Sequence, residues 1–260
     1  MLTTAASYRA IAANLPQSLS AAAAKPQVAR ETAYYLENIG AVKSIDDFMG
    51  DDRIFSYAMK AFGLQDMTYA KAFMRKALTE GIADRDSFAN KLGDPRYREF
   101  VDTFNFAQFG GTTTIFDITR QGTVDRYVRQ TLEEDVGEQN EGVRLALYFE
   151  RKAGDVTSPF GILADAALLK VAQTALGLPA TMSFLDIDRQ AEMISARLDL
   201  DDLKDPEKLK AFLGRFTSLW EIDNPSTPAG MPSLAIGQPR AAGIAPNLLA
   251  SLQNLKLGGS

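Results

Sequence analysis

Residues 54–64 read Ile-Phe-Ser-Tyr-Ala-Met-Lys-Ala-Phe-Gly-Leu, and this stretch decides the class of the fold. Counted from Ile54, apolar side chains recur at positions i, i+3, i+4, i+7 and i+8, which is the period of one face of an α-helix. Gly63 directly follows the last of them, and glycine is the residue that most easily takes the left-handed conformation that ends a helix. The stretch is therefore predicted to be an amphipathic helix with a glycine C-terminus.

A second stretch, residues 168–178, follows the same pattern. It reads Leu-Leu-Lys-Val-Ala-Gln-Thr-Ala-Leu-Gly-Leu, so its Ala, Gly and Leu positions repeat those of residues 54–64. Three further matches keep the same order along the chain: Ala33–Glu37 with Ala146–Glu150 (which requires a one-residue gap), Leu92–Pro95 with Leu203–Pro206, and Phe100 and Phe104 with Phe212 and Phe216. A period this long exceeds that of a solenoid repeat, so duplication of a small helical module is favoured.

The sequence thus predicts an all-α fold with two diverged copies of a unit of about 75 residues, joined by a loop and a connecting helix and flanked by flexible tails. The expected parts are an N-terminal helical tail (1–29), a first repeat (30–106), a connector (107–141), a second repeat (142–223) and a Pro/Gly-rich C-terminal tail (224–260). The expected helices are 30–39, 51–62, 68–80 and 95–105 in the first repeat, and 142–152, 165–176, 187–198 and 206–219 in the second.

Helix starts are marked by capping residues. Ser44 opens a capping-box pattern that has an Asp three residues later. Asp94-Pro95 and Asp205-Pro206 each pair an N-cap residue with a proline at the first helical position, where its missing N–H costs nothing.

The connector and the tails are expected to differ from the repeats. Gly110–Thr114 is expected to form a loop or a short extended stretch, and Thr123–Leu132 a helix that runs towards the second repeat. Near the C-terminus, Pro246–Leu257 is a possible helix with Leu248, Leu249, Leu252 and Leu255 on one side. Such a tail helix either docks on its own core or pairs with a partner, and both alternatives stay open.

Composition excludes several classes of function. The 260 residues include no Cys and no His, so thiolate nucleophiles, zinc fingers and every mechanism with a histidine base are ruled out. The net charge of -5 argues against nucleic acid as the main partner. The chain has neither a run of 18 apolar residues nor a recognisable signal peptide, which leads us to expect no membrane span and a cytoplasmic or flagellum-associated location.

The charges are unevenly distributed. Residues 1–30 and 225–260 contain five bases and no acid, so the middle of the chain carries all 33 acids against 23 bases (28 less five). The simplest interpretation is an acidic folded centre with low-complexity ends.

Candidate sites are better explained as structure. The acids of Asp199–Asp205 lack the glycine and glutamate of a calcium loop, and N-capping explains them more simply. Asp46, Asp47, Asp51 and Asp52 fit helix N-termini better than acid–base catalysis. Gly110-Gly111 is favoured as a turn over an anion site, and Tyr34, Tyr35, Tyr148 and Phe149 as a core stripe over a ligand box. No catalytic, cofactor or metal residue is predicted.

Four motifs carry a family resemblance. They are Asn140–Ala153, Ile162–Val171, Thr174–Pro179 and Phe212–Phe216. Together they resemble the bacterial domain-of-unknown-function family 1217, over nearly all of residues 30–220. Genes of this family occur mainly in alphaproteobacteria, often among flagellar genes, so the resemblance implies a flagellar setting. It implies no catalytic residue.

The leading hypothesis is a non-enzymatic flagellum-associated structural or assembly protein that acts through protein contacts. Its low-charge ends and lack of Cys are shared with flagellar axial proteins, although it lacks their β-rich middle. The alternatives are a cytoplasmic helical adaptor or flagellar export chaperone, with a groove between the repeats, and an enzyme of unrecognised type. The residues proposed for contact with a protein partner are Arg144, Arg151, Arg215, Leu248, Leu249 and Leu252.

Overall fold

The computed structural model describes residues 2–225, and within that range every regular element is an α-helix or a 3₁₀ helix. The predicted all-α class is therefore confirmed. The α-helices up to the connector are α1 (Thr4–Ala13), α2 (Leu15–Ala23), α3 (Pro26–Asn38), α4 (Ile45–Gly50), α5 (Asp52–Ala61), α6 (Lys71–Glu80), α7 (Phe88–Lys91), α8 (Pro95–Thr103) and α9 (Phe106–Phe109). They are followed by α10 (Gln121–Gln139), α11 (Glu141–Lys152), α12 (Pro159–Leu163), α13 (Ala166–Leu176), α14 (Ile187–Ser195) and α15 (Pro206–Asp223).

Short 3₁₀ helices fill most of the connections. They are η1 (Ile39–Ala41), η2 (Gln65–Met67), η3 (Gly110–Ile115), η4 (Asp117–Thr119), η5 (Ala153–Asp155), η6 (Ala180–Phe184) and η7 (Leu200–Lys204). The proposed partner residues Leu248, Leu249 and Leu252, and the C-terminal tail that holds them, lie outside the described residues.

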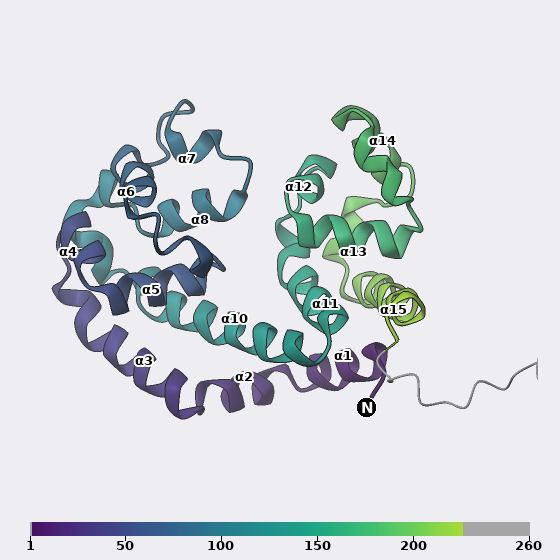
Figure 1. Ribbon diagram of the computed structural model, residues 1–260, viewed down its shortest axis with the longest axis horizontal. Helices are drawn as coiled ribbons and strands as arrows, with labels where there is room; N and C mark the ends of the chain where they lie inside the picture. The colour runs from purple at the N-terminus through teal and green to yellow at the C-terminus, as the bar shows by residue number, and fades with distance from the viewer. Residues whose placement is uncertain (1, 226–260) are drawn as a thin grey trace, which may run out of the picture. The chain divides into compact units, whose positions relative to one another are not determined.

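The helices gather around two hydrophobic cores. The first core contains buried residues from Ala22 to Leu132, and the second contains residues from Val143 to Trp220 together with Tyr8 of α1. We call α2–α9 with η1–η4 the first lobe, and α11–α15 with η5–η7 and α1 the second lobe. Figure 1 shows the two groups of helices rising from opposite ends of α10, which links them.

Helix α5 is the amphipathic helix predicted from residues 54–64. Ile54, Tyr57 and Ala58 on its apolar face are at most 3% exposed. Gly63 has a φ of 69°. The Leu64 N–H donates to Met59 O at 2.8 Å and the Gly63 N–H to Lys60 O at 2.9 Å, which is the Schellman arrangement that satisfies the last carbonyls of a helix.

The predicted caps are confirmed. Ser44 Oγ accepts from the Asp47 N–H at 3.0 Å at the start of α4. Asp94 and Asp205 cap α8 and α15, each followed by proline at the first helical turn. The acids of Asp199–Asp205 likewise include the caps of η7 and α15, as their N-capping interpretation predicts.

The N-terminal segment is not a flexible tail, and that expectation is wrong. Tyr8 is only 4% exposed, because α1 packs on α11 and α15 in the second lobe. The Thr4 N–H also donates to Glu221 Oε2 at 2.8 Å. Helix α2 then lies along α10, so the first two helices of the chain run from one lobe to the other beneath α10 (Figure 1).

The prediction for Gly110–Thr114 is also wrong, because the stretch is neither a loop nor extended. It forms the 3₁₀ helix η3, and tertiary hydrogen bonds fix it there: Thr114 Oγ1 donates to Val42 O at 2.8 Å, and Thr119 Oγ1 donates to Thr113 O at 2.7 Å. These partners are distant or buried, so the sequence of the stretch does not reveal them.

Candidate functional site: a charged cleft and an apolar connector surface

A cleft of about 580 Å³ lies between the two lobes. Its walls come from the end of α5, from α8 and α10, from α11 and from the start of α13. The lining is rich in charge. It contains the bases Arg96, Arg126, Arg144, Arg151, Lys152 and Lys170 and the acids Asp94, Glu99, Glu141 and Asp165.

Glu99 joins the two sides of this cleft. It stands on α8 of the first lobe and accepts a hydrogen bond from Nζ of Lys152, on α11 of the second lobe, at 2.6 Å. Its other oxygen pairs with Arg126 of α10. Burial alone would raise the pKa of Glu99, but the neighbouring Lys152 and Arg126 outweigh it and hold that pKa below its usual value.

Changing Glu99 to glutamine should therefore weaken the fold in a pH-dependent way. A carboxylate with a lowered pKa stabilises the folded state above its unfolded pKa, and this contribution is lost as the pH falls through the folded pKa. We expect Glu99→Gln to lower the free energy of unfolding by about 1–2 kcal/mol at pH 7. The deficit should shrink on acidification below about pH 4. Urea denaturation across that pH range measures it, and an equal deficit at pH 3 and pH 7 would contradict the assignment.

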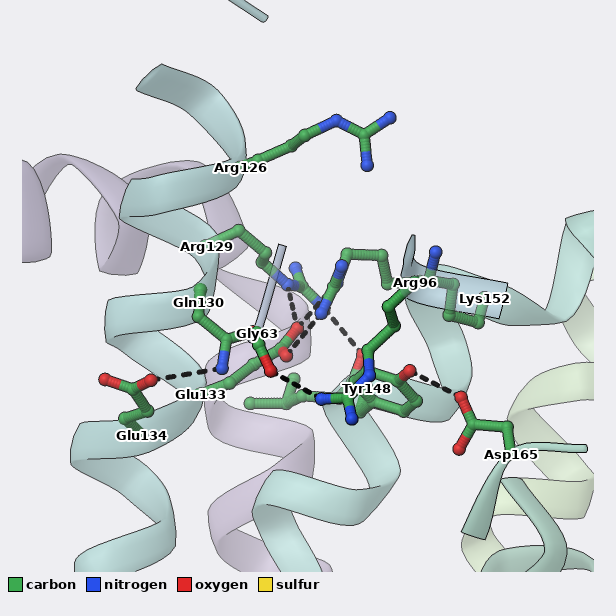
Figure 2. A network of polar contacts seen from close by, with 12 residues as sticks. Gly63, Arg96, Arg126, Arg129, Gln130, Glu133, Glu134, Tyr148, Lys152 and Asp165 are labelled. Carbon is green, nitrogen blue, oxygen red and sulfur yellow. Dashed lines mark hydrogen bonds and ion pairs between the residues drawn. The ribbon is translucent and has the colours of Figure 1, made fainter. Parts of the chain in front are cut away.

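A buried ion-pair network adjoins the cleft through Arg151, which lines it (Figure 2). Glu133 of α10 is only 1% exposed. Its carboxylate accepts from Arg129 Nε at 2.9 Å and from Arg151 Nη2 at 2.7 Å, and Arg129 Nη2 donates to Leu147 O at 2.8 Å. The network therefore connects α10 to α11 through the buried carboxylate of Glu133.

A second set of contacts lines the cleft. Arg96 donates from Nη1 to the Gly63 carbonyl at the end of α5 (Figure 2). Arg96 also pairs with Asp94 at 2.7 Å. Opposite, the Tyr148 hydroxyl donates to Asp165 Oδ2 at 2.6 Å, and Asp165 also caps α13. Burial and the Asp165 carboxylate raise the pKa of the Tyr148 hydroxyl.

Most of the charged side chains that line the cleft form ion pairs within the protein. Hydrogen bonds and ion pairs hold the pKa of Glu99 and Asp94 below the usual range, although burial opposes this. A general acid at neutral pH needs the opposite shift. Glu150 does have a raised pKa, chiefly because it is buried, but it lies beside Tyr8 and is not part of the cleft lining. Among residues 2–225 no three side chains group as metal ligands.

The three proposed partner arginines do not form one surface. Arg144 and Arg151 both line the cleft, where Arg144 pairs with Glu141 and Arg151 with Glu133. Arg215 is exposed on α15 and is not part of the cleft lining. The sequence analysis missed the buried ion pair of Arg151 because its partner, Glu133, is 18 residues away. The sequence does contain one indication of a buried ion pair, which is the i,i+4 pair Arg129–Glu133 within an apolar helix face.

The predicted aromatic stripe divides in two. Tyr35 and Phe149 are fully buried in the two cores, as the core interpretation predicts. Tyr34 and Tyr148 are only partly buried, and each donates its hydroxyl to the aspartate that caps a helix, Asp51 or Asp165.

A second feature is an apolar surface on the connector, formed by Phe109, Ile115, Phe116 and Ile118. These side chains are 38–57% exposed, and the rings of Phe109 and Phe116 meet edge to face at 5.2 Å. Thr113, Thr114 and Thr119 of the same segment are fully buried, whereas Thr112 and Asp117 are exposed. The segment therefore turns three threonine side chains inward and these four apolar side chains outward. We call this the connector surface.

The fold and these sites define an all-helical, two-lobed protein with a charged cleft and an exposed apolar connector. The chain belongs to the family described as protein of unknown function (DUF1217), whose model matches residues 61–209, and the predicted resemblance is confirmed.

The chain is also similar to the X-ray structure of a protein from Agrobacterium tumefaciens solved by a structural genomics consortium. That protein is 50% identical, the match covers 85% of this chain and 94% of that one, and the TM-score is 0.80. A comparison with curated proteins found no match. In the described part of the chain, no helix combines the length and apolarity needed to cross a membrane.

Proposed function

We propose that the protein is a non-enzymatic, flagellum-associated structural or assembly protein that acts through protein–protein contacts. The observation that carries the proposal is the connector surface. Large exposed apolar patches on folded proteins mark sites of interaction.

The burial pattern of the connector supports this role. The hydroxyls of Thr114 and Thr119 donate to backbone carbonyls, and the Tyr35 hydroxyl donates to Thr119 O at 2.5 Å. The backbone is thereby held in a conformation that leaves Ile115 more than half exposed. If the apolar side chains of the connector surface turned inward, these hydrogen bonds would break. We therefore expect a protein partner to cover them.

The flagellar setting rests on the family resemblance, which implies genes that lie among flagellar genes. A deletion strain of the source bacterium tests it. We expect lost motility, with the tagged protein in the sheared flagellar fraction on immunoblots. Normal motility with intact flagella would overturn the proposal.

A connector variant tests the contact itself. We expect Ile115→Asp combined with Ile118→Asp to change the free energy of unfolding by less than about 0.5 kcal/mol, because both side chains are exposed. The folded variant should nevertheless fail to restore motility to the deletion strain, because a charge would be buried in the contact. Ile222→Asp is the matched control, since Ile222 is 73% exposed elsewhere, on α15. Equal rescue by both variants would show that the connector surface is not the contact.

A cytoplasmic adaptor or flagellar export chaperone is the second candidate, and the cleft favours it. The cleft takes walls from both lobes and is lined by charged side chains of both. The fractionation separates the two candidates, because lost motility with the protein only in the cytosol favours the adaptor.

We also propose that the two lobes arose by duplication. The order of elements α3–η1–α4–α5–η2–α6 recurs as α11–η5–α12–α13–η6–α14. The hydrogen-bond pairs Tyr34–Asp51 and Tyr148–Asp165 have the same spacing and lie 114 positions apart in the chain. The Schellman end of α5 recurs at α13, where the Leu178 N–H donates to Gln173 O at 2.9 Å.

These contacts favour one register for the proposed duplication. Tyr34 corresponds to Tyr148 rather than to Leu147, which removes the one-residue gap that the sequence comparison needed. The offset of 114 then holds from Tyr34–Tyr148 to Gly63–Gly177. It is 116 at the starts of α6 and α14, Lys71 and Ile187, and falls to 111 at Asp94–Asp205.

A further inference from the structure

The second lobe carries an exposed apolar surface of its own, on α12, η6 and α14. It comprises Phe160, Phe184, Leu185 and Ile187, which are 45%, 88%, 43% and 57% exposed. Helices α12 and α14 pack on each other, so the helix that holds Phe160 adjoins the helix that begins at Ile187. We call these four side chains the α12–α14 face. Exposed apolar side chains that gather in this way mark a contact with another protein.

Two unpaired acids lie within this face. Asp186 and Asp188 alternate with its apolar residues and are exposed, and within residues 2–225 neither makes an ion pair. The neighbouring base, Arg189, pairs with Glu192 instead. A surface that combines apolar side chains with unpaired bases would therefore complement the α12–α14 face.

Two unpaired bases lie at the edge of the connector surface, in the first lobe. Lys43 Nζ donates to Gly40 O at 2.7 Å, and a Cβ on Gly40 would lie 3.1 Å from Nη1 of Arg120, so both bases adjoin this glycine. Lys43 also touches the connector, because a Cβ on Gly111 would lie 3.2 Å from the Lys43 Cβ. Arg120 follows Ile118 of the connector surface by two residues. In the part of the chain that the structure describes, neither base makes an ion pair.

The acids near the connector surface do not pair with these bases. Asp47 accepts from the backbone N–H of Lys43 at 3.1 Å, not from its ammonium group. Asp117 is the one acid in residues 106–120 and is exposed. The connector surface therefore offers the combination of apolar side chains and unpaired bases that complements the α12–α14 face.

We propose that the connector surface of one copy of this chain binds the α12–α14 face of a second copy, head to tail. The two surfaces of one chain lie apart, because the connector packs on α9 and η1 and the two lobes rise from opposite ends of α10 (Figure 1). The inference deepens the proposed function and rests on it, since it names another copy of the chain as the partner of the connector surface.

Charge also disfavours the symmetric alternative. A two-fold pairing of two α12–α14 faces would bring four unpaired acids together, and like charges that face each other oppose binding. A head-to-tail contact instead places the bases of one copy beside the acids of the next. It leaves one surface of each kind unused at the ends, so further copies can add.

Two variants that each lose one surface provide the test. The connector variant carries Ile115→Asp with Ile118→Asp, and the face variant carries Phe184→Asp with Ile187→Asp; all four side chains are more than half exposed. Sedimentation velocity of the full-length protein over about 1–100 μM measures association. We expect the wild type to form species that grow with concentration, and each variant alone to associate at least about tenfold more weakly, because a charge would be buried.

An equimolar mixture of the two variants is the decisive sample. One intact surface of each kind remains in it, so we expect a dimer and nothing larger. Ile222→Asp is the control and should assemble as the wild type does, since Ile222 is exposed elsewhere, on α15. Circular dichroism confirms that each variant is folded, and serine replaces aspartate wherever it is not.

Charge reversal tests the orientation of the contact. Lys43→Glu in the face variant should weaken the mixed dimer about fivefold, because an exposed base next to the connector surface no longer meets acids. Asp188→Lys in the connector variant should offset that loss. Unchanged or tighter binding after Lys43→Glu alone would contradict the proposed pairing.

Three further results would overturn the proposal. Wild-type protein that stays monomeric over the whole range does so without any variant. Dimers formed by either variant alone would mean that like surfaces pair, and a monomeric mixture would mean that the two surfaces do not bind each other.

Failure of this inference is distinguishable from failure of the proposed function. If the wild type is monomeric but the connector variant still fails to restore motility, the connector binds a different protein and only the head-to-tail contact is lost. If the protein self-associates but the connector variant restores motility, only the proposed function is contradicted.

Discussion

Glu133→Gln is expected to lower the free energy of unfolding by about 3–5 kcal/mol. Glu133 is 1% exposed and carries the negative charge between Arg129 and Arg151. The substitution keeps the size of the side chain but removes the counter-charge to which both guanidinium groups are hydrogen-bonded in the interior. Removing one partner of a buried ion pair is among the most damaging single changes in a protein. Urea denaturation at pH 7, followed by circular dichroism, measures the loss.

Glu192→Gln is the matched control for this prediction. Glu192 also pairs with an arginine, Arg189, but both side chains are about two-thirds exposed. Exposed ion pairs contribute little, so the control should change stability by less than about 0.5 kcal/mol. A similar small effect for Glu133→Gln would mean that water reaches the Glu133 site and that the network does not tie α10 to α11.

Gly142→Ala is expected to destabilise the protein by about 1–3 kcal/mol through overpacking. A Cβ at position 142 would lie 2.3 Å from Cδ1 of Trp220 and 2.8 Å from Cγ2 of Thr4. Both neighbours are buried, so neither can move away freely. The clash opposes the helix propensity of alanine, which by itself would favour the substitution by up to about 1 kcal/mol. Trp220 is the only tryptophan, so its fluorescence reports the displacement directly.

Gly214→Ala provides the opposite expectation within the same lobe. Gly214 lies inside α15, and a Cβ there meets no atom within 4 Å. Alanine should stabilise the protein by up to about 1 kcal/mol because of its higher helix propensity. If both substitutions stabilise the protein, α1 and Trp220 do not pack tightly against the start of α11.

Local patterns in the sequence predicted the helices well. The expected helices 51–62 and 206–219 are observed as Asp52–Ala61 and Pro206–Asp223, and 68–80 as Lys71–Glu80. Helical periodicity, N-caps and a C-terminal glycine act within a few residues of one another, so one sequence is enough to recognise them. Family membership also came from the sequence, because its motifs are contiguous.

The sequence did not predict the docking of α1 or the 3₁₀ connector. The sequence predicted a helical segment at residues 1–29, but what Tyr8 and Leu15 of that segment pack against depends on residues more than a hundred positions away. The connector combines glycines and threonines, which favour a loop on local grounds. Its buried hydroxyl contacts with Val42 and Thr113 override that preference.

The candidate site was almost wholly a tertiary result. Arg144 and Arg151 were selected from the sequence, but Glu99 was not, since its partner Lys152 is 53 residues away. The exposed connector surface could not be predicted from the sequence either. Apolar side chains are expected to be buried, and only the tertiary hydrogen bonds of the connector show that these are exposed.

By itself, then, the sequence determined the helical class, the places where most helices begin and end, and the family. Those features follow from backbone hydrogen bonding and side-chain periodicity, which operate over one or two turns. Only the tertiary structure decided which charges meet across the cleft, that α1 joins the second lobe, and which apolar side chains stay exposed. These depend on packing between distant segments, where burial and desolvation, rather than local conformation, set the free energy.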